Sequence, residues 1–316
     1  MKKALIILFL TPLLSCSNNS NTSTKSYSES DLTTLKKTYG TFSITRGDGG
    51  NNNASYNEET NTYTIPVEEK KAEYVLQGYS DARFVFANPN SVADYKGIKI
   101  NLNKACIVSN STSSVFYYSL GSKNIEVGAK KNTKNILLNI GEGNVIDSQA
   151  NIELTGKGSL ELFSKGATSG GHTVRASSAI SLYESVNLTI NSGHDGLHCD
   201  SIYTYNNDDA TNKYTGTIKF GKIVSQAMEA TTSQCEGLIK LTSGTFTIDS
   251  CDSVFKSDIS ISISSGVSVK ASSTTSNPVV KQDKDEVDEN VTIPSLKLEN
   301  SGTFIANGET IESQTF

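Results

Sequence analysis

The 316-residue chain contains no tryptophan, and it has only five prolines, three histidines and two methionines. No window of the sequence carries the sustained apolar stripe of an amphipathic helix, which argues against a helical bundle. The five cysteines lack CxxC spacing, so neither a zinc ribbon nor a disulfide scaffold is indicated. The formal net charge of −5 is not that of a nucleic-acid-binding protein.

Short segments that alternate apolar and polar residues are what the chain does contain. Residues 63–67, 74–78 and 98–102 show this period of two, and Ser, Thr, Asn and Gly residues separate such segments. β-Branched and aromatic residues with turn residues between them are typical of strands. The composition therefore predicts an all-β protein.

The N-terminus carries a targeting segment rather than part of the fold. Residues 1–15 begin with Lys2 and Lys3, continue with an apolar run and end just before Cys16. The ending Leu-Leu-Ser-Cys resembles the lipobox of bacterial lipoproteins, which implies that Cys16 is a lipid anchor in the bacterial cell envelope, at the outer membrane or cell surface. An ordinary cleaved signal with an incidental cysteine is the alternative.

Three segments follow from this interpretation. Residues 1–15 are the signal peptide, and residues 16–35 are the lipidated cysteine with a polar, low-complexity tether. Residues 36–316 form the remaining domain. One expected partner is a membrane, which the protein contacts through the anchor. The second is the ligand of the domain.

A longer period appears from about residue 115 onward. An inward apolar residue, here called the marker residue, recurs at intervals of 23 to 31 residues with short strands between its copies. Such a period is typical of a solenoid, and it predicts a single-stranded right-handed parallel β-helix. The marker residues are Phe116, Ile146, Val174, Leu197, Met228, Phe255 and Val280.

Several coils together resemble a known family. The stretch NIELTGKGSLEL at residues 151–162, the corner GHTVRA and the stretch LTINSGHDGLHCD at residues 188–200 are similar to the calcium-associated carbohydrate-binding β-helix family, whose fold resembles that of pectate lyases. The family's Asp-Asp-Gly-Ile corner is here His194-Asp195-Gly196-Leu197, so one acid of two is kept. The resemblance implies carbohydrate as the ligand and Ca²⁺ as the cofactor.

One residue after each marker residue lies an outward column of ionisable and polar groups. If the register holds, these side chains stack at about one strand spacing, roughly 4.8 Å. The column is either a surface salt-bridge ladder or a set of contacts for an acidic or hydroxyl-rich polysaccharide lying along the axis. It contains Tyr117, Asp147, Arg175, His198, Glu229, Lys256 and Lys281, of which Arg175, His198, Glu229 and Lys256 are the binding candidates.

Tyrosines are the aromatic rings available to stack on a sugar. Residues 203–214 interrupt one coil, and insertions in solenoids protrude on one face that often binds ligand. Tyr203 and Tyr205 are the candidates there, and ordinary loop tyrosines are the alternative. The rings of Tyr117, Tyr118 and Tyr214 are further options.

Calcium takes six to eight oxygen ligands, so the acids of the corners are its candidates. Asp195 and Asp200 are expected to share one corner, and Asp252 and Asp258 a similar corner two coils on, where a separate ion would be needed. The insertion could add two more carboxylates to the first corner. These two are Asp208 and Asp209.

The sequence thus predicts a lipid-anchored envelope protein that binds polysaccharide without catalysis. A calcium-dependent polysaccharide lyase is the first alternative, with Arg175 or Lys256 as the base. Against it, no compact group of acids with a base is apparent, and His172 and His194 lie at corners where a role in the turn suffices. A surface adhesin or structural rod is the second alternative.

The anchor can be tested by the substitution Cys16→Ser. We expect the unsubstituted protein to incorporate radiolabelled palmitate and to sediment with membranes, because several acyl chains hold a protein stably in a bilayer. The variant should lose the label and leave the membrane fraction. An unmodified mature Cys16 in the mass spectrum of the native protein would instead support an ordinary cleaved signal.

Overall fold

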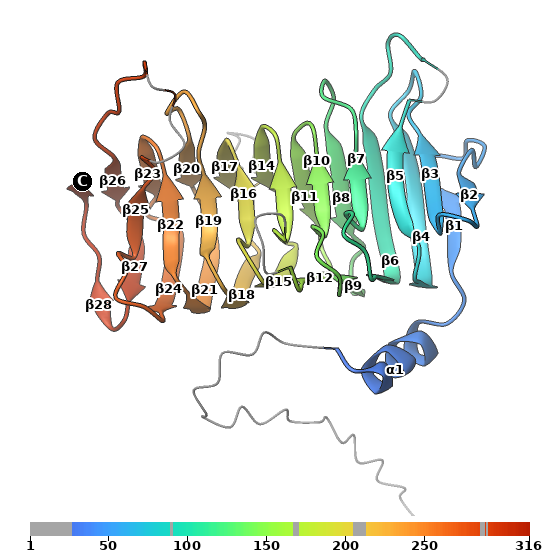
Figure 1. Ribbon diagram of the computed structural model, residues 1–316, viewed down its shortest axis with the longest axis horizontal. Coiled ribbons are helices and arrows are strands. Elements are labelled where there is room, and N and C mark those ends of the chain that lie inside the picture. The colour runs from blue at the N-terminus through green and yellow to red at the C-terminus, as the bar shows by residue number, and fades with distance from the viewer. Residues whose placement is uncertain (1–26, 89–90, 167–170, 205–212, 285–287, 289) are drawn as a thin grey trace, which may run out of the picture.

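The computed structural model is an elongated parallel β-solenoid, with successive coils following one another along its long axis (Figure 1). The structure describes residues 27–88, 91–166, 171–204, 213–284, 288 and 290–316. Each coil contributes strands to three faces, which we number in the order in which the chain meets them. The prediction of a parallel β-helix is confirmed.

Face 1 forms one continuous sheet of short parallel strands that carries the marker residues. At its N-terminal edge β2 (Ser55–Asn57) pairs antiparallel with the first strand. The parallel strands are β3 (Thr62–Pro66), β5 (Arg83–Ala87), β7 (Phe116–Tyr118), β10 (Ile146–Ser148), β13 (Val174–Ala176), β16 (Leu197–Cys199), β19 (Gln226–Ala230), β22 (Ser253–Ser257) and β25 (Val280–Gln282).

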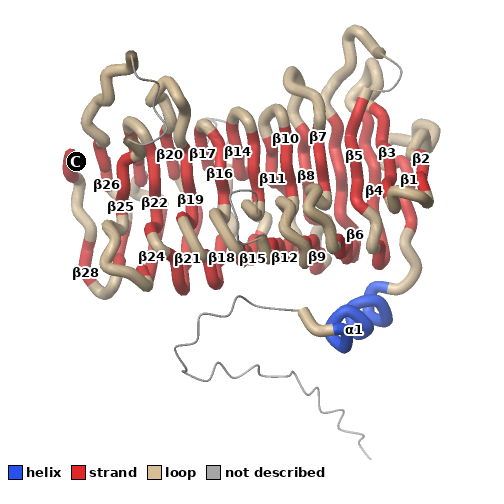
Figure 2. Tube along the Cα trace, viewed as in Figure 1, coloured by secondary structure: helices blue, strands red, loops and turns tan. Residues whose placement is uncertain are grey.

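Faces 2 and 3 belong to a second sheet that turns a corner between them (Figure 2). Two long strands, β4 (Ala72–Ser80) and β6 (Ile98–Ser109), cross both faces at the N-terminal end. Face 2 continues with β8 (Ile125–Ala129), β11 (Ile152–Gly156), β14 (Ala179–Leu182), β17 (Ser201–Thr204), β20 (Leu238–Leu241), β23 (Ser260–Ile263) and β26 (Lys297–Asn300). Face 3 continues with β9 (Lys134–Asn139), β12 (Ser159–Ser164), β15 (Asn187–Ser192), β18 (Thr217–Ile223), β21 (Gly244–Cys251), β24 (Val267–Ser273) and β27 (Thr303–Ala306).

Antiparallel strands close both ends of this second sheet. β1 (Ser43–Arg46) pairs with β4 at the first coil. At the last coil β28 (Glu309–Thr310) pairs with β27, and β29 (Gln314–Thr315) pairs with β26. These short strands cover edges that would otherwise expose unpaired backbone groups to another chain.

The core is a stack of apolar side chains that point into the coils. The marker residues Phe116, Ile146 and Val174 pair in register, and so do the four that follow, up to Val280. Each is buried, because parallel pairing places like residues directly above one another. The predicted register of the coils is confirmed.

A short helix that the sequence did not reveal packs on the outside of the solenoid. α1 (Glu29–Tyr39) starts at Ser28, whose side chain forms a capping box with Asp31. The predicted tether over residues 16–35 is therefore wrong from Glu29 onward, because only three spaced apolar residues mark this helix, and residues 16–26 lie outside the described part of the chain. In the described part of the chain, no helix combines the length and the apolar character of a membrane span.

The helix covers an apolar patch on the outer side of face 3. Leu32 and Leu35 pack with Tyr39 against this patch, and the Tyr27 ring meets Phe163 edge-on at 5.1 Å between ring centres. The patch consists of Cys106, Val108, Ile136, Leu138 and Phe163. The four cysteines from Cys106 onward are free and buried, as expected of isolated core thiols.

A glycine at the corner that follows β11 provides a test of the close stacking between coils. Gly156 has φ of +102°, and a Cβ there would lie 2.2 Å from the Ala129 carbonyl oxygen. We expect Gly156→Ala to lower the free energy of unfolding by about 1 to 3 kcal/mol, measured by urea denaturation. Gly121→Ala is the matched control, because a Cβ there meets its nearest neighbour at 3.5 Å. Equal effects of the two substitutions would contradict the tight corner.

Candidate functional site

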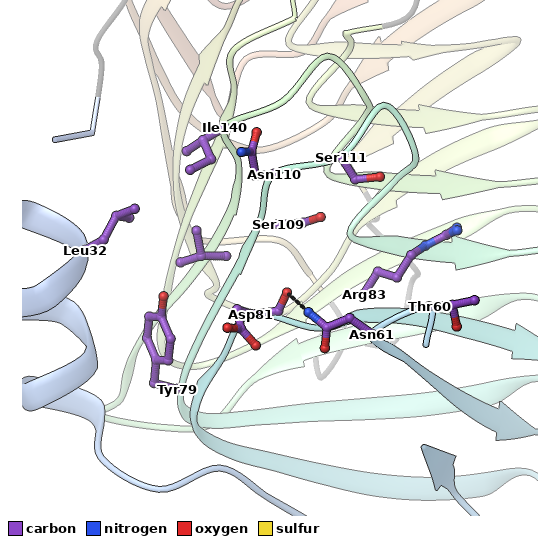
Figure 3. Close-up of a pocket in the computed structure, with 11 residues that line it drawn as sticks. Leu32, Thr60, Asn61, Tyr79, Asp81, Arg83, Ser109, Asn110, Ser111 and Ile140 are labelled. Atoms are coloured by element: carbon purple, nitrogen blue, oxygen red, sulfur yellow. Dashed lines mark hydrogen bonds between the residues drawn. The ribbon is translucent and has the colours of Figure 1, made fainter. Parts of the chain in front are cut away.

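Two grooves of similar size occur on the described surface. One lies between α1 and the first coils and has a volume of about 560 Å³. Its side chains include Leu32, Tyr79, Asp81 and Arg83, and the Asn61 amide donates a hydrogen bond to the Asp81 carbonyl oxygen at 3.1 Å (Figure 3). This mixture of isolated polar groups holds no cluster of ionisable side chains.

The other groove runs over the outer side of face 1 and has a volume of about 550 Å³. It is formed by outward residues of β13, β16, β19, β22 and β25 together with the corners that precede the first four of these strands. Its lining residues are His172, Arg175, His194, Asp195, His198, Ser225, Gln226, Glu229, Asp252, Lys256 and Lys281. All three histidines of the chain meet here.

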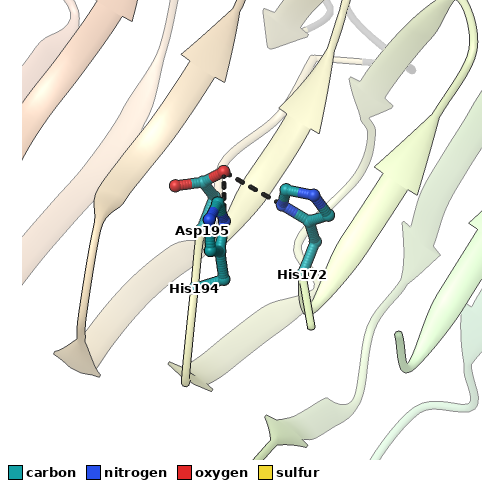
Figure 4. A group of neighbouring side chains, drawn as sticks. All are labelled: His172, His194 and Asp195. Carbon is teal, nitrogen blue, oxygen red and sulfur yellow. Dashed lines mark hydrogen bonds and ion pairs between the residues drawn. The ribbon is translucent and has the colours of Figure 1, made fainter. Parts of the chain in front are cut away.

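The histidines surround one carboxylate. The Nδ1 atoms of His172 and His194 each lie 2.9 Å from Oδ2 of Asp195 (Figure 4), and the Nδ1 atom of His198 lies 3.3 Å from the same oxygen. Asp195 is fully buried, whereas the side chain of His194 retains 31% of its exposure. Three imidazole nitrogens therefore converge on one buried oxygen at the floor of the groove.

A second charged group adjoins the first. Nζ of Lys256 lies 3.0 Å from Oε1 of Glu229 and 3.3 Å from Oδ2 of Asp283. Gln226 joins the two groups: its backbone N–H donates to Oδ1 of Asp195 at 3.0 Å, and its side-chain nitrogen, when turned toward the carboxylates, donates to Oε2 of Glu229 at 2.9 Å. The site is thus one connected network of acids, imidazoles and an ammonium group.

The network shifts the pKa values of Asp195, His172 and His194. Burial raises the pKa of Asp195, but the three neighbouring imidazoles outweigh burial and hold it well below its usual value. Burial lowers the pKa of His172 despite the nearby carboxylate, so His172 is neutral near pH 7. The polar contact with Asp195 raises the pKa of His194 against the effect of burial.

Lys256 lowers the pKa of Glu229, and Glu229 raises the pKa of Lys256. Burial and the charge of Asp195 raise the pKa of Glu229, although Lys256 and His198 counteract them. Burial disfavours the charged form of Lys256, but Glu229 and Asp283 keep its pKa above the ordinary value. Lys256 is therefore a stable cation, and its predicted alternative role as a base does not fit this pairing.

The predicted ladder is present in the register expected. Arg175 pairs with His198, His198 with Glu229, Glu229 with Lys256, and Lys256 with Lys281 in successive strands. The four binding candidates from the sequence thus share one groove. The expectation that no compact group of acids and bases exists is wrong, because three neighbouring coils bring their ionisable residues together.

The tyrosines do not contribute to this groove as the sequence suggested. Tyr203 belongs to β17 on face 2, where it pairs with Ser181 and Lys240, and so lies on another side of the solenoid. Tyr214 and Tyr118 are fully buried and belong to the core. Tyr205 lies outside the described residues.

The candidate calcium ligands are spread over several places. Asp195 precedes β16 and Asp200 follows it, so an extended chain of five residue steps, roughly 16 Å, separates them rather than a shared corner. Asp252 and Asp258 flank β22 in the same way. The proposed corner pairs are therefore wrong, and the two acids Asp208 and Asp209 lie outside the described residues.

Asp252 and Asp258 already have protein partners. The side chains of Thr275 and Asn277 donate to Oδ1 of Asp252 at 2.8 and 2.6 Å. Oδ2 of Asp258 accepts hydrogen bonds from the backbone N–H groups of Thr232 and Gly237 at 2.7 and 2.8 Å. Asp258 thus secures the turn between β19 and β20.

Sequence reasoning missed the column that lies two residues before the marker residues. His172, Asp195 and Gln226 occupy this position in three successive coils. The sequence contains the information needed to find this column. The spacing from the marker residues that defines the outward column also places these three residues above one another. The sequence suggests a turn role for His172 and an oxygen ligand for Asp195, and neither role alone indicates that the two side chains meet.

No family model and no curated protein sequence matches the chain. A solved structure does: a polysaccharide lyase-like protein from C. thermocellum, in a gadolinium derivative, is similar over 79% of this chain and 94% of that chain. The TM-score is 0.57 and the sequence identity 16%. The chain shares the parallel β-solenoid fold of that protein. At this identity the likeness extends to the fold alone, so carbohydrate and calcium binding stay predictions.

The role of Asp258 can be tested by pH-dependent unfolding. Burial raises its pKa above the ordinary value, and the nearby Asp283 adds to this, although the backbone hydrogen bonds oppose it. Since the folded state then binds a proton more readily than the unfolded state, stability should increase as pH falls from 7 toward 4. Asp258→Asn should remove the contribution of this group to the increase while keeping an acceptor for the two N–H groups.

Asp258→Ala is the matched comparison, because it removes the acceptor as well as the charge. We expect it to lose about 1 to 3 kcal/mol of unfolding free energy at both pH values, measured by urea denaturation. An Asp258→Asn variant as unstable as the Asp258→Ala variant would show that the negative charge itself is needed, as in a cation site.

Proposed function

We propose that the groove on face 1 binds an acidic polysaccharide that lies along the solenoid axis, and that the protein presents this groove from a lipid anchor at Cys16. The support for the anchor is the lipobox-like sequence at residues 13–16. The support for the ligand is the charge pattern of the outward column. A stiff solenoid suits display of an extended groove for an extended polymer.

The observation that carries the proposal is a pair of cations on either side of the central network. Arg175 is exposed, and among the ion pairs of the described residues neither Arg175 nor Lys281 takes part. Four strand steps separate the two, which is roughly 19 Å along the axis. Lys256 between them is neutralised by Glu229 and Asp283. Two unpaired cations at this spacing favour a polymer with repeated negative charges over a small anion.

The local cations of the groove favour an acidic ligand although the whole chain carries a net charge of −5. Local cations in a groove attract an anion through their own field, which outweighs the distant charges of the opposite sign at physiological salt. Guanidinium groups bind carboxylates through two parallel hydrogen bonds. A uronate polymer offers such carboxylates at regular intervals.

A polysaccharide lyase is the second candidate, and one observation favours it. His172 is buried and neutral beside a groove that holds cations on both sides. In β-elimination a base takes the proton from the carbon next to the uronate carboxylate, a C=C bond forms, and the glycosidic C–O bond breaks as its oxygen gains a proton. A neutral imidazole can act as the base in the first step. A protein that only binds the polysaccharide needs no such base.

Binding to polygalacturonate tests the proposal directly. We expect Arg175→Ala and Lys281→Ala each to weaken binding by roughly tenfold, because each removes a charge-assisted contact. The affinity of the unsubstituted protein should fall as salt rises. Lys240→Ala is the matched control, since Lys240 lies in β20 on face 2 and outside the groove. Affinity can be measured by calorimetry on the full chain in detergent.

The same samples distinguish the alternatives. Growth of ultraviolet absorbance from an unsaturated product would identify a lyase, and its absence together with binding would identify a non-catalytic protein. Equal binding by the groove variants and the control would contradict the groove. Failure of acidic and neutral polysaccharides alike to bind would overturn the proposal in favour of a structural rod or adhesin.

A further inference from the structure

The three histidines and the carboxylate that they surround form a site with a chemistry of its own. From the convergence of these four side chains we propose that His172, His194, His198 and Asp195 bind a divalent transition-metal ion of the zinc class. Glu229 lies within reach as an additional oxygen ligand, since its carboxylate groups with Asp195 and His198. This inference does not depend on the polysaccharide.

The distances from the Asp195 carboxylate to the three imidazoles suit ligands of one ion. The Nδ1 atoms of the histidines lie 2.9, 2.9 and 3.3 Å from Oδ2 of Asp195. Ligands about 2.1 Å from a zinc ion, at angles of roughly 90° to 109°, are separated from each other by about 3.0 to 3.4 Å. The donor atoms form two groups that share Asp195, one with His172 and His194 and one with His198 and Glu229, and within each group they lie no more than 4.8 Å apart.

Hydrogen bonding alone does not account for the cluster. One carboxylate oxygen has about two lone-pair positions, yet three imidazole nitrogens face Oδ2. In the described structure the buried Nδ1 atoms of His172 and His198 have no hydrogen-bond partner, although both lie close to Asp195. His172 is only 4% exposed, so water does not readily take the partner's place. A metal ion would give every one of these lone pairs a partner.

The kind of donor decides the kind of ion. Imidazole nitrogen suits zinc and other transition metals, whereas calcium and magnesium prefer oxygen ligands throughout. Three nitrogens and one carboxylate are a common set for a zinc-class ion. The predicted calcium ligand Asp195 therefore lies in surroundings that favour a different metal.

The surroundings also hold the ligands in place. The backbone N–H of Gln226 donates to Oδ1 of Asp195, which leaves Oδ2 directed at the histidines. Strands β13 and β16 pair in register and fix the spacing between the coils that carry the ligands. Such outer contacts orient ligands and raise metal affinity. The partly exposed His194 leaves the site accessible from the groove.

The test uses metal binding to the full chain, purified in detergent and stripped with a chelator. We expect about one Zn²⁺ or Co²⁺ ion per chain by equilibrium dialysis and elemental analysis, and a Co²⁺ absorption spectrum typical of nitrogen ligands. Saturating Zn²⁺ should raise the thermal midpoint of unfolding, because the ion binds the folded state. Ca²⁺ at the same concentration should neither bind at one ion per chain nor raise the thermal midpoint.

Substitutions then locate the site. His194→Ala and Asp195→Asn should each weaken Zn²⁺ binding by roughly tenfold or more. His194 is partly exposed, so its variant remains informative if the substitution of a buried ligand prevents folding. Asp252→Asn is the matched control, an acid of the same groove outside the histidine cluster. Loss of binding in this control but not in the His194 variant would overturn the proposal.

Two further results would also overturn it. One is failure of both Zn²⁺ and Co²⁺ to bind the folded, chelator-treated chain. The other is a preference for Ca²⁺ over Zn²⁺. None of these measurements involves a polysaccharide, so a failure of the metal site and a failure of glycan binding are told apart.

Discussion

Parallel hydrogen bonding between successive coils is the constraint on which the rest of the structure depends. It places each residue of a face directly above its equivalent one coil earlier, at about one strand spacing. Most inward positions are therefore apolar, and they form one continuous buried stack from the first coils to Ala306. Buried polar residues stack in the same way, as Ser164 does with Ser192 through a hydrogen bond of 3.0 Å. Outward positions become columns, so the chemistry of a face is decided by which residues the sequence repeats at one position of the coil.

Stacked columns explain why a site arises on face 1. Ionisable groups a strand spacing apart interact strongly, and buried charges are tolerated only when they are paired. Asp195 is surrounded by imidazoles, and Glu229 and Asp283 share Lys256. On either side of this paired centre the column carries Arg175 and Lys281. The groove thus has a floor of paired charges, with Arg175 and Lys281 on either side of it, and this arrangement is the basis of both the metal-site and the polysaccharide proposals.

The helix α1 shows a second consequence of the same architecture. Columns that point outward on face 3 happen to be apolar over three coils, at Val108, Leu138 and Phe163. An exposed apolar patch of this kind invites association with other molecules. The helix covers it with Leu32 and Leu35.

The sequence by itself determined the fold and the register, because the periodic marker residues obey a rule that is local and repeated. The column Arg175, His198, Glu229 and Lys256 followed from that register alone. Only the tertiary structure decided that His172 and His194 turn toward Asp195, because side-chain direction at a corner depends on neighbours in other coils. The tertiary structure also decided the place of α1, because its apolar side chains pack against a patch formed by strands that are distant in sequence. It likewise decided that Asp195 and Asp200 lie apart, because a strand separates them although they are close in sequence.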